Sequence, residues 1–272
     1  MNPITQDMGG APQPAGADSL PDPLVRAEHY RVLAAAFAYP DAEELATLLA
    51  EAEQAAAAAG QSELASFSAA LLTAVEPGLA GEYNRLFAQS VACSPYETSY
   101  VAADKGVQLG RLAALMEAFC VRSRGAEHES PDHIGSELEF MAFLCLKEAT
   151  HRDETSAEGQ EAYAAVRQAQ ALFLQEHVAR WAGVFADGLR RATRLPFYAL
   201  LAELLPTWLA QDLTRNGWPY EPLVPRRHLP LLQPDGSLQS TIATGDVDDD
   251  AMSCPMASPQ SEPTDGEPVF IG

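Results

Sequence analysis

The sequence of 272 residues is long enough for one large domain or two small ones, with a hydrophobic core that needs no disulfide or metal staples. Hydrophobic residues make up 47% and charged residues 20%, alanine is abundant and β-branched residues are scarce, so a β-sandwich or barrel is disfavoured. The formal charge of −21 at pH 7 disfavours nucleic acid and anionic membranes as partners and favours a cationic peptide or protein.

Cysteine usage and the N-terminal sequence predict a cytoplasmic location. The four cysteines are far apart and form no CxxC pair, which argues against a zinc ribbon or a redox pair and favours reduced thiols. Residues 1–23 contain no basic cluster followed by an apolar run, so we expect no secretory signal. No apolar stretch approaches the ~18 residues that a membrane-spanning helix needs.

Composition divides the chain into three parts. Residues 1–23 are rich in Pro, Gly and small polar types, which predicts a flexible arm. Residues 229–272 contain eight acidic residues and no Lys or Arg, which predicts an acidic, disordered tail. Between them, residues 24–228 form the expected helical domain.

The first half of this domain is predicted to be a series of helices followed by a loop. Apolar spacing predicts a helix over residues 24–39, closed by Pro40. Asp41 is expected to cap a second helix that ends at Gly60, and Ser62 to cap a third. A short helix is predicted over 78–87. Residues 89–101 have no helical period, so we expect an ordered loop or extended link there.

The second half is also predicted to be helical. Asp104 is expected to cap a helix, and Ser130 to cap another in which Pro131 takes the first position. A long helical region over 157–193 is expected to be interrupted or bent near Gly183. A last helix over 197–216 contains a proline and stops at a glycine. The prediction is an all-α fold, a single compact bundle of roughly eight to ten helices.

The clearest local cluster of polar side chains lies around the predicted helix start at residue 131. His133 and Glu137 are one helical turn apart and could share a ligand. A metal site would need a third ligand, for which His128 and Glu129 are candidates, but the spacing is not HExxH. Two alternatives are a helix-start network in which Asp132 caps backbone amides, and a site that recognises a cation or hydrogen-bond donor of a partner.

Motifs of common enzymes are missing from the sequence. There is no GxSxG, which argues against a hydrolase of that type, and no GxxxxGK[ST] or GxGxxG for binding phosphate. The Arg190–Arg191 pair is interpreted as a solvated helix face.

Aromatic and apolar residues flank the irregular loop and lie within it. Tyr83, Leu86 and Phe87 precede the loop, and Pro95 and Tyr96 belong to it. Apolar rings in a loop readily line a groove. Together with the helix start at 131–140, they predict a partly apolar cleft edged with carboxylates, which would suit a peptide with hydrophobic residues and an arginine pair.

Three motifs in register resemble the TorD/DmsD family of redox-enzyme maturation chaperones, which is more distantly related to the nitrate reductase chaperone NarJ. They are residues 82–87 (EYNRLF), 94–100 (SPYETSY) and 131–141 (PDHIGSELEFM). Weaker similarity continues through residues 177–181 (HVARW) and 197–198 (FY), so that the resemblance covers about residues 24–213.

The resemblance implies a non-enzymatic chaperone without a cofactor of its own. Such proteins bind the twin-arginine leader and the apo form of a molybdenum enzyme of the dimethyl sulfoxide reductase type, aid cofactor insertion together with cofactor-delivery proteins, and prevent premature export. The alternative is a helical metal-binding protein or metalloenzyme that uses His133 and Glu137. Carried over by position, the residues that line or support the peptide-binding region are Tyr83, Leu86, Phe87, Pro95, Tyr96, Glu97, Pro131, Asp132, His133 and Glu137.

Overall fold

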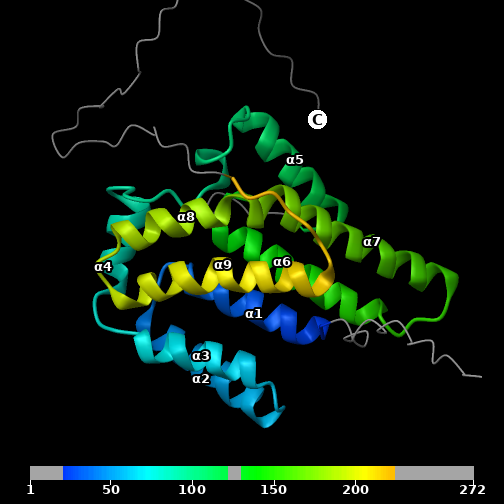
Figure 1. Ribbon diagram of the computed structural model, residues 1–272, viewed down its shortest axis with the longest axis horizontal. Helices are drawn as coiled ribbons and strands as arrows, with labels where there is room; N and C mark the ends of the chain where they lie inside the picture. The colour runs from blue at the N-terminus through cyan, green and yellow to red at the C-terminus, as the bar shows by residue number, and fades with distance from the viewer. Residues whose placement is uncertain (1–20, 122–129, 224–272) are drawn as a thin grey trace, which may run out of the picture. The chain divides into compact units, whose positions relative to one another are not determined.

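A computed structural model describes residues 21–121 and 130–223, which lie in the first of the chain's two units, ending at Pro225 (Figure 1). Within them the fold is all-helical, as predicted, with one isolated β-bridge. The elements in chain order are α1 (Pro23–Ala36), α2 (Ala42–Ala58), α3 (Ser62–Ala74), α4 (Leu79–Tyr83), η1 (Asn84–Ala88), η2 (Glu97–Ser99), α5 (Lys105–Ala118), α6 (Ile134–His151), α7 (Ala157–Phe173), η3 (Leu174–Val178), α8 (Ala179–Ala192) and α9 (Pro196–Asn216).

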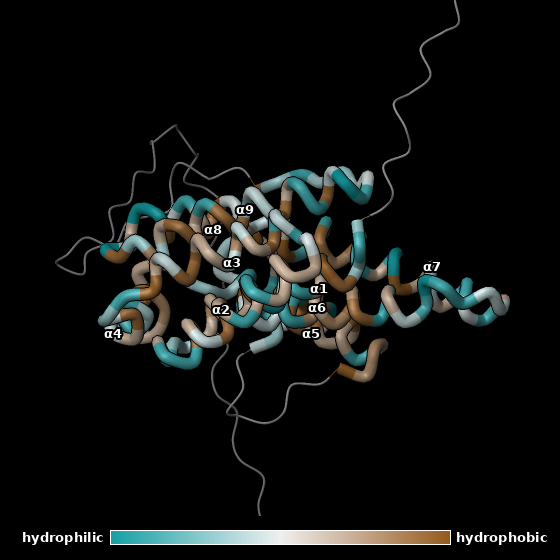
Figure 2. Tube along the Cα trace, turned by 90° about the horizontal axis from the view of Figure 1, so that it is seen from below, coloured by the Kyte–Doolittle hydropathy of each residue, from teal (hydrophilic) through white to brown (hydrophobic). Residues whose placement is uncertain are grey.

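The core lies where α1 and α6 pack along each other, while α2 pairs with α3, α6 with α7, and α8 with α9. Figure 2 shows hydrophobic positions gathered where these helices meet, and hydrophilic positions along the outer part of α7. α5 packs chiefly against η2. This arrangement places the segment from η1 to η2 and the start of α6 near α8, so that α8 contacts all three of the motifs at 82–87, 94–100 and 131–141.

Several helix starts agree with the sequence prediction because they are local. Asp41 accepts hydrogen bonds from the backbone N–H groups of Glu43 and Glu44, and Asp104 accepts one from Val107. Gly217 adopts a left-handed conformation (φ 69°) at the end of α9, as its position predicted.

Two predicted caps are wrong. Ser62 is the first residue of α3, and Gln61 before it makes no side-chain cap bond. Ser130 does not cap α6, which begins only at Ile134 with His133 as its cap. The hydroxyl of Ser130 instead donates to Asp132 at 2.5 Å, so that the segment 130–133 forms a turn before the helix.

The long helical region over 157–193 is interrupted at Leu174–Val178 rather than near Gly183. These five residues form the π-helical turn η3 between α7 and α8. A π-helical turn shifts the side-chain register of the helix that follows it, and such turns are frequent at functional sites. A second π-helical turn, η1, follows α4 directly, where a single short helix was predicted.

The boundaries predicted for the three parts of the chain remain predictions, because residues 1–20 and 224–272 lie outside the described residues. Among those that are described, no single helix is long and apolar enough to cross a membrane. The pair formed by α3 and the α4–η1 segment passes that test only together, with a bend of 95° at the break.

Candidate functional site

The loop 94–100 is joined to the start of α6 by backbone hydrogen bonds. Ile134 donates its backbone N–H to the carbonyl of Pro95 at 2.9 Å, and Glu97 donates to the carbonyl of Asp132, also at 2.9 Å. Tyr96 and His133 form the antiparallel bridge between the two segments, and their rings meet edge to face at 5.4 Å. Two predicted motifs that are more than thirty residues apart in the sequence therefore form one structure, which we call the junction.

Asp132 holds this junction together through its side chain. Its carboxylate accepts hydrogen bonds from the hydroxyl of Thr98 at 2.6 Å, from the backbone N–H of Thr98 at 3.3 Å and from the hydroxyl of Ser130. Of the alternatives open for this segment, capping of the helix start by Asp132 is not what the structure shows, because Asp132 bonds the loop across 34 residues of sequence. The helix cap is His133, whose Nδ1 accepts from the N–H of Gly135.

Behind the junction lies a buried carboxyl pair, Glu97 and Glu137, each with a fully buried side chain. Glu97 accepts hydrogen bonds from Gln108 of α5 at 3.0 Å and from Nδ1 of His177 of η3, also at 3.0 Å. Oε2 of Glu137 accepts from the indole N–H of Trp181 of α8 at 3.1 Å. The pair therefore connects four elements, η2, α5, α6 and the η3–α8 segment.

Glu137 holds its proton more tightly than an ordinary glutamate does. Burial, followed by the negative charge of Glu97, raises the pKa of Glu137 well above its ordinary value. Oε1 of Glu137 is buried and meets no donor, so it is satisfied only when Glu137 is protonated and donates to Glu97. Ionisation of Glu137 beside Glu97 is therefore disfavoured.

The third predicted motif, at residues 82–87, is largely buried and lies in an aromatic cluster that Phe185 connects to Tyr100 of the loop. The ring of Phe87 contacts those of Tyr83, Phe185 and Tyr198, with centroids 5.1 to 6.3 Å apart. Leu86 is fully buried, and its carbonyl accepts from the N–H of Cys93.

The charged residues of this motif hold the end of α4 and the start of η1 against the α8–α9 connection. Glu82 accepts hydrogen bonds from Arg85, from the N–H of Arg194 at 2.6 Å and from Thr193. The Arg85 hydrogen bond is the largest cause that lowers the pKa of Glu82 to about 2. Arg85 in turn donates to the carbonyl of Ala192.

α8 links the aromatic cluster to the carboxyl pair. Trp181 bonds Glu137 and stacks on Tyr100 at 5.2 Å, and one turn later Phe185 contacts Phe87. Sequence reasoning placed His177 and Trp181 only in a weak His-x-x-x-Trp pattern and did not include them, or Gln108 and Thr98, among the site residues. The spacing of four residues between His177 and Trp181 was the available signal, since it puts both side chains on one helical face.

The structure thus brings together seven of the ten predicted residues at the junction and leaves Tyr83, Leu86 and Phe87 in the aromatic cluster. It does not show a cleft edged with carboxylates, because Glu97, Asp132 and Glu137 are all buried. Tyr96 and Pro131 keep partly exposed side chains there. The role of all ten residues in binding remains a prediction.

The metal alternative gains no support from the described part of the chain. Within residues 21–121 and 130–223, no group of three or more His, Cys, Asp or Glu side chains could hold a metal ion. Nδ1 of His133 is occupied by the helix cap. The other two candidate ligands, His128 and Glu129, lie outside the described residues.

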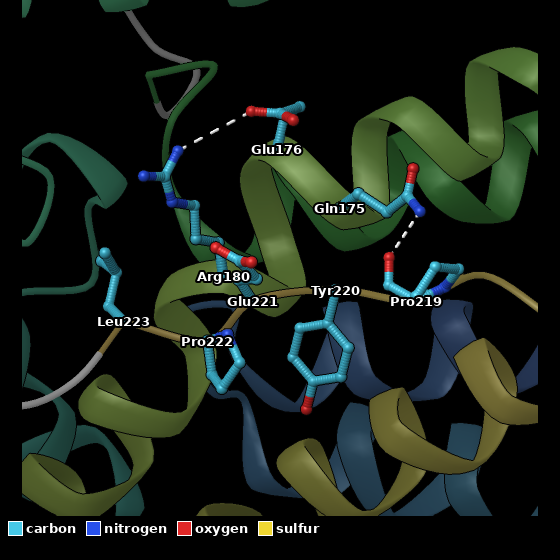
Figure 3. Close-up of a pocket in the computed structure, with 8 residues that line it drawn as sticks. All are labelled: Gln175, Glu176, Arg180, Pro219, Tyr220, Glu221, Pro222 and Leu223. Carbon is cyan, nitrogen blue, oxygen red and sulfur yellow. Dashed lines mark hydrogen bonds and ion pairs between the residues drawn. The ribbon is translucent and has the colours of Figure 1, made fainter.

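A pocket opens on the exposed side of the η3–α8 segment (Figure 3). It is lined by Gln175, Glu176, Arg180 and the segment 219–223. Arg180 and Glu176 form a long ion pair of 3.7 Å, with side chains 44% and 58% exposed. Neither the pocket nor the segment that covers it was predicted.

Comparison with known proteins identifies the family. Residues 41–187 match the family described as the nitrate reductase delta subunit. The chaperone protein TorD of Photobacterium profundum is 29% identical over 123 residues, which are 43% of this chain and 53% of that protein. The chlorate reductase assembly chaperone protein of Ideonella dechloratans is 36% identical over 102 residues, which are 36% of this chain and 50% of that protein.

A third relative, the selenate reductase assembly chaperone protein of Thauera selenatis, is 39% identical over 74 residues, which are 27% of this chain and 35% of that protein. The chain spans about half the length of the first two relatives. All three are named as chaperones and none as an enzyme, in agreement with the expected non-catalytic role. The chain therefore belongs to the nitrate reductase delta subunit family, and the predicted kinship with TorD-type maturation chaperones is confirmed.

Proposed function

We propose that this protein is a cytoplasmic maturation chaperone for a molybdenum enzyme of the dimethyl sulfoxide reductase type. It binds the twin-arginine leader and the apo catalytic subunit, holds them while cofactor-delivery proteins supply the molybdopterin guanine dinucleotide cofactor, and prevents export before insertion is complete. The observation that carries this proposal is the match of residues 41–187 to the nitrate reductase delta subunit family, whose relatives here are named as reductase chaperones.

The geometry supports a division of labour within the predicted region. Tyr96 and Pro131 are partly exposed at the junction and are the residues that contact the leader. Asp132, Glu97 and Glu137 are buried and position the loop beneath them. A rigid loop binds a peptide at a smaller entropic cost than one that must be ordered on binding.

Charge supports the choice of a cationic leader as ligand. The chain carries a formal charge of −21, so a peptide with paired arginines is attracted from a distance. Salt screens such attraction beyond a Debye length, which is about 8 Å at physiological ionic strength. Leader binding should therefore weaken as salt is added.

The test is binding of a labelled synthetic leader, with adjacent arginines followed by a leucine-rich run, measured by fluorescence anisotropy. Tyr96→Ala should weaken binding about tenfold, which corresponds to about 1.4 kcal/mol for losing an aromatic anchor. Tyr163→Ala, at a partly exposed tyrosine of α7 outside the site, is the matched control. Equal affinities of the two variants, or affinity that is insensitive to salt, would contradict the proposal.

A further inference from the structure

The last described residues, Trp218–Leu223, form an extended segment that we call the strap. α9 ends in a paired turn in which Trp218 donates its N–H to the carbonyl of Leu213 and Gly217 donates to that of Thr214. The chain then leaves the helix and runs without helical structure along η3 and α8, as Figures 1 and 3 show. The strap is thus positioned by the helix end that precedes it.

Both ends of the strap are hydrogen-bonded to the segment beneath. The side-chain amide of Gln175 donates to the carbonyl of Pro219 at 2.5 Å, and the N–H of Leu223 donates to the carbonyl of Arg180 at 2.8 Å. The ring of Trp218 lies under the guanidinium of Arg167 at 4.5 Å. The strap backbone is held as the backbone of a bound peptide would be.

The side chains of the strap divide into two sets, as those of a bound extended peptide do. Trp218, Tyr220 and Leu223 are partly buried and pack against the core. Pro219, Glu221 and Pro222 are exposed. The strap is therefore held by hydrogen bonds to η3–α8 and by aromatic and aliphatic side chains, two or three residues apart, that pack against the core.

The same η3–α8 segment supports the proposed site. Its side chains Gln175, Glu176 and Arg180 line the pocket beside the strap. Its side chains His177 and Trp181 hold the carboxyl pair behind the loop 94–100. The strap and the carboxyl pair therefore contact the same short piece of helix.

We infer that the strap occupies, within the free protein, a groove on η3–α8 that takes the extended apolar run of the client leader. The inference rests on the proposed function and adds to it a second contact surface and an autoinhibitory segment. The leader fits the groove because the strap shows which chemistry the groove accepts, an extended chain with large apolar side chains. The exposed carboxylate of Glu176, in a long and weak ion pair, is available to an arginine of the leader.

The test compares two double variants of the full chain. Tyr220→Ser with Leu223→Ser removes the buried anchors of the strap, whereas the control, Tyr163→Ser with Leu172→Ser, makes the same exchanges on α7 away from the strap. If the strap occupies the groove in most molecules, only the remaining fraction of molecules can bind the leader, and the apparent affinity is reduced in proportion. Releasing the strap removes this reduction, so the anchor variant should bind the labelled synthetic leader about fivefold more tightly. The control variant should bind as the wild type does.

Hydrogen exchange of the wild type supplies a second readout. Leader binding should increase deuterium uptake in residues 218–223 and decrease it in 174–182, because the N–H of Leu223 loses its acceptor while the groove gains a new occupant. Equal leader affinity of wild type and anchor variant, with unchanged exchange in the strap, overturns the inference and leaves the proposed function standing. Failure of every folded variant to bind the leader overturns both.

Discussion

Glu137 is a buried carboxyl group whose neighbours supply negative charge rather than a cation. It faces Glu97 of η2 and Trp181 of α8, with Asp132 contributing further negative charge. The donors His177 and Gln108 bond the other carboxyl, that of Glu97. Such an arrangement costs stability whenever both carboxyls ionise, and it lies directly behind the junction of two motifs of the family.

The raised pKa of Glu137 predicts that the folded protein loses stability as pH rises. The pKa of Glu137 is raised above the unfolded value of 4.5, so above that pH the unfolded chain releases the proton first. Stability is therefore lost as pH rises, by up to about 1.4 kcal/mol per pH unit for one retained proton. Glu137→Gln keeps an amide that can donate to Glu97. Its free energy of unfolding, measured in urea, should exceed that of the wild type at pH ~8, and the difference should be smaller at pH ~5.

Glu139→Gln, at an exposed position of the same helix, is the control for this experiment. It should follow the wild-type curve at every pH. If Glu137→Gln destabilises the protein equally at all pH values, the raised pKa of Glu137 is ruled out.

At the scale of elements, the loop 94–100 and the start of α6 act as one unit. The sequence identified both segments but not their junction, because the decisive bonds, from Thr98 to Asp132 and from Ile134 to Pro95, are non-local. Caps formed by residues close in sequence, as at Asp41 and Asp104, could be predicted from residue type. The start of α6 could not be predicted in this way, because Asp132 bonds Thr98, 34 residues away, and the helix begins only at Ile134.

Thr98→Val tests this junction with little change of side-chain volume. It removes the donor to Asp132 at 2.6 Å and leaves a buried carboxylate less satisfied, which should cost about 1 to 3 kcal/mol of unfolding free energy. Leader binding should weaken as well. Thr47→Val, at an exposed threonine that bonds only its own helix backbone, should change unfolding free energy by less than about 0.5 kcal/mol. Equal effects of the two variants would show that the junction does not stabilise the loop.

Over the whole molecule, apolar periodicity predicted the bundle, whereas the polar network that joins its helices was not predicted. Arg26 of α1 is buried and donates to Asp212 of α9 at 2.7 Å, to Glu148 of α6 at 2.9 Å and to Gln170 of α7. Each partner comes from a different helix, so no spacing along the chain reveals the set. The strap, and the position of the break between α7 and α8, were missed for the same reason, since tertiary contacts define them.

Arg26→Met is predicted to destabilise the bundle by about 3 to 5 kcal/mol, because it leaves the carboxylates of Asp212 and Glu148 buried without their cation. Arg31→Met, on the same helix, breaks only a partly exposed pair with Glu28 and should cost less than about 1 kcal/mol. Urea unfolding followed by circular dichroism measures both. Similar midpoints for the two variants would show that the network does not join the four helices.

The central claim, that the protein holds an immature molybdenum enzyme through its leader, is tested most directly by capture of the partner. The full-length tagged protein would be isolated from its own cells grown without oxygen, and bound proteins identified by mass spectrometry. We predict recovery of a molybdenum-enzyme catalytic subunit that still bears its twin-arginine leader, lost with Tyr96→Ala and kept with Tyr163→Ala. Capture of no such subunit, or only of subunits whose leader has been removed, would contradict the claim.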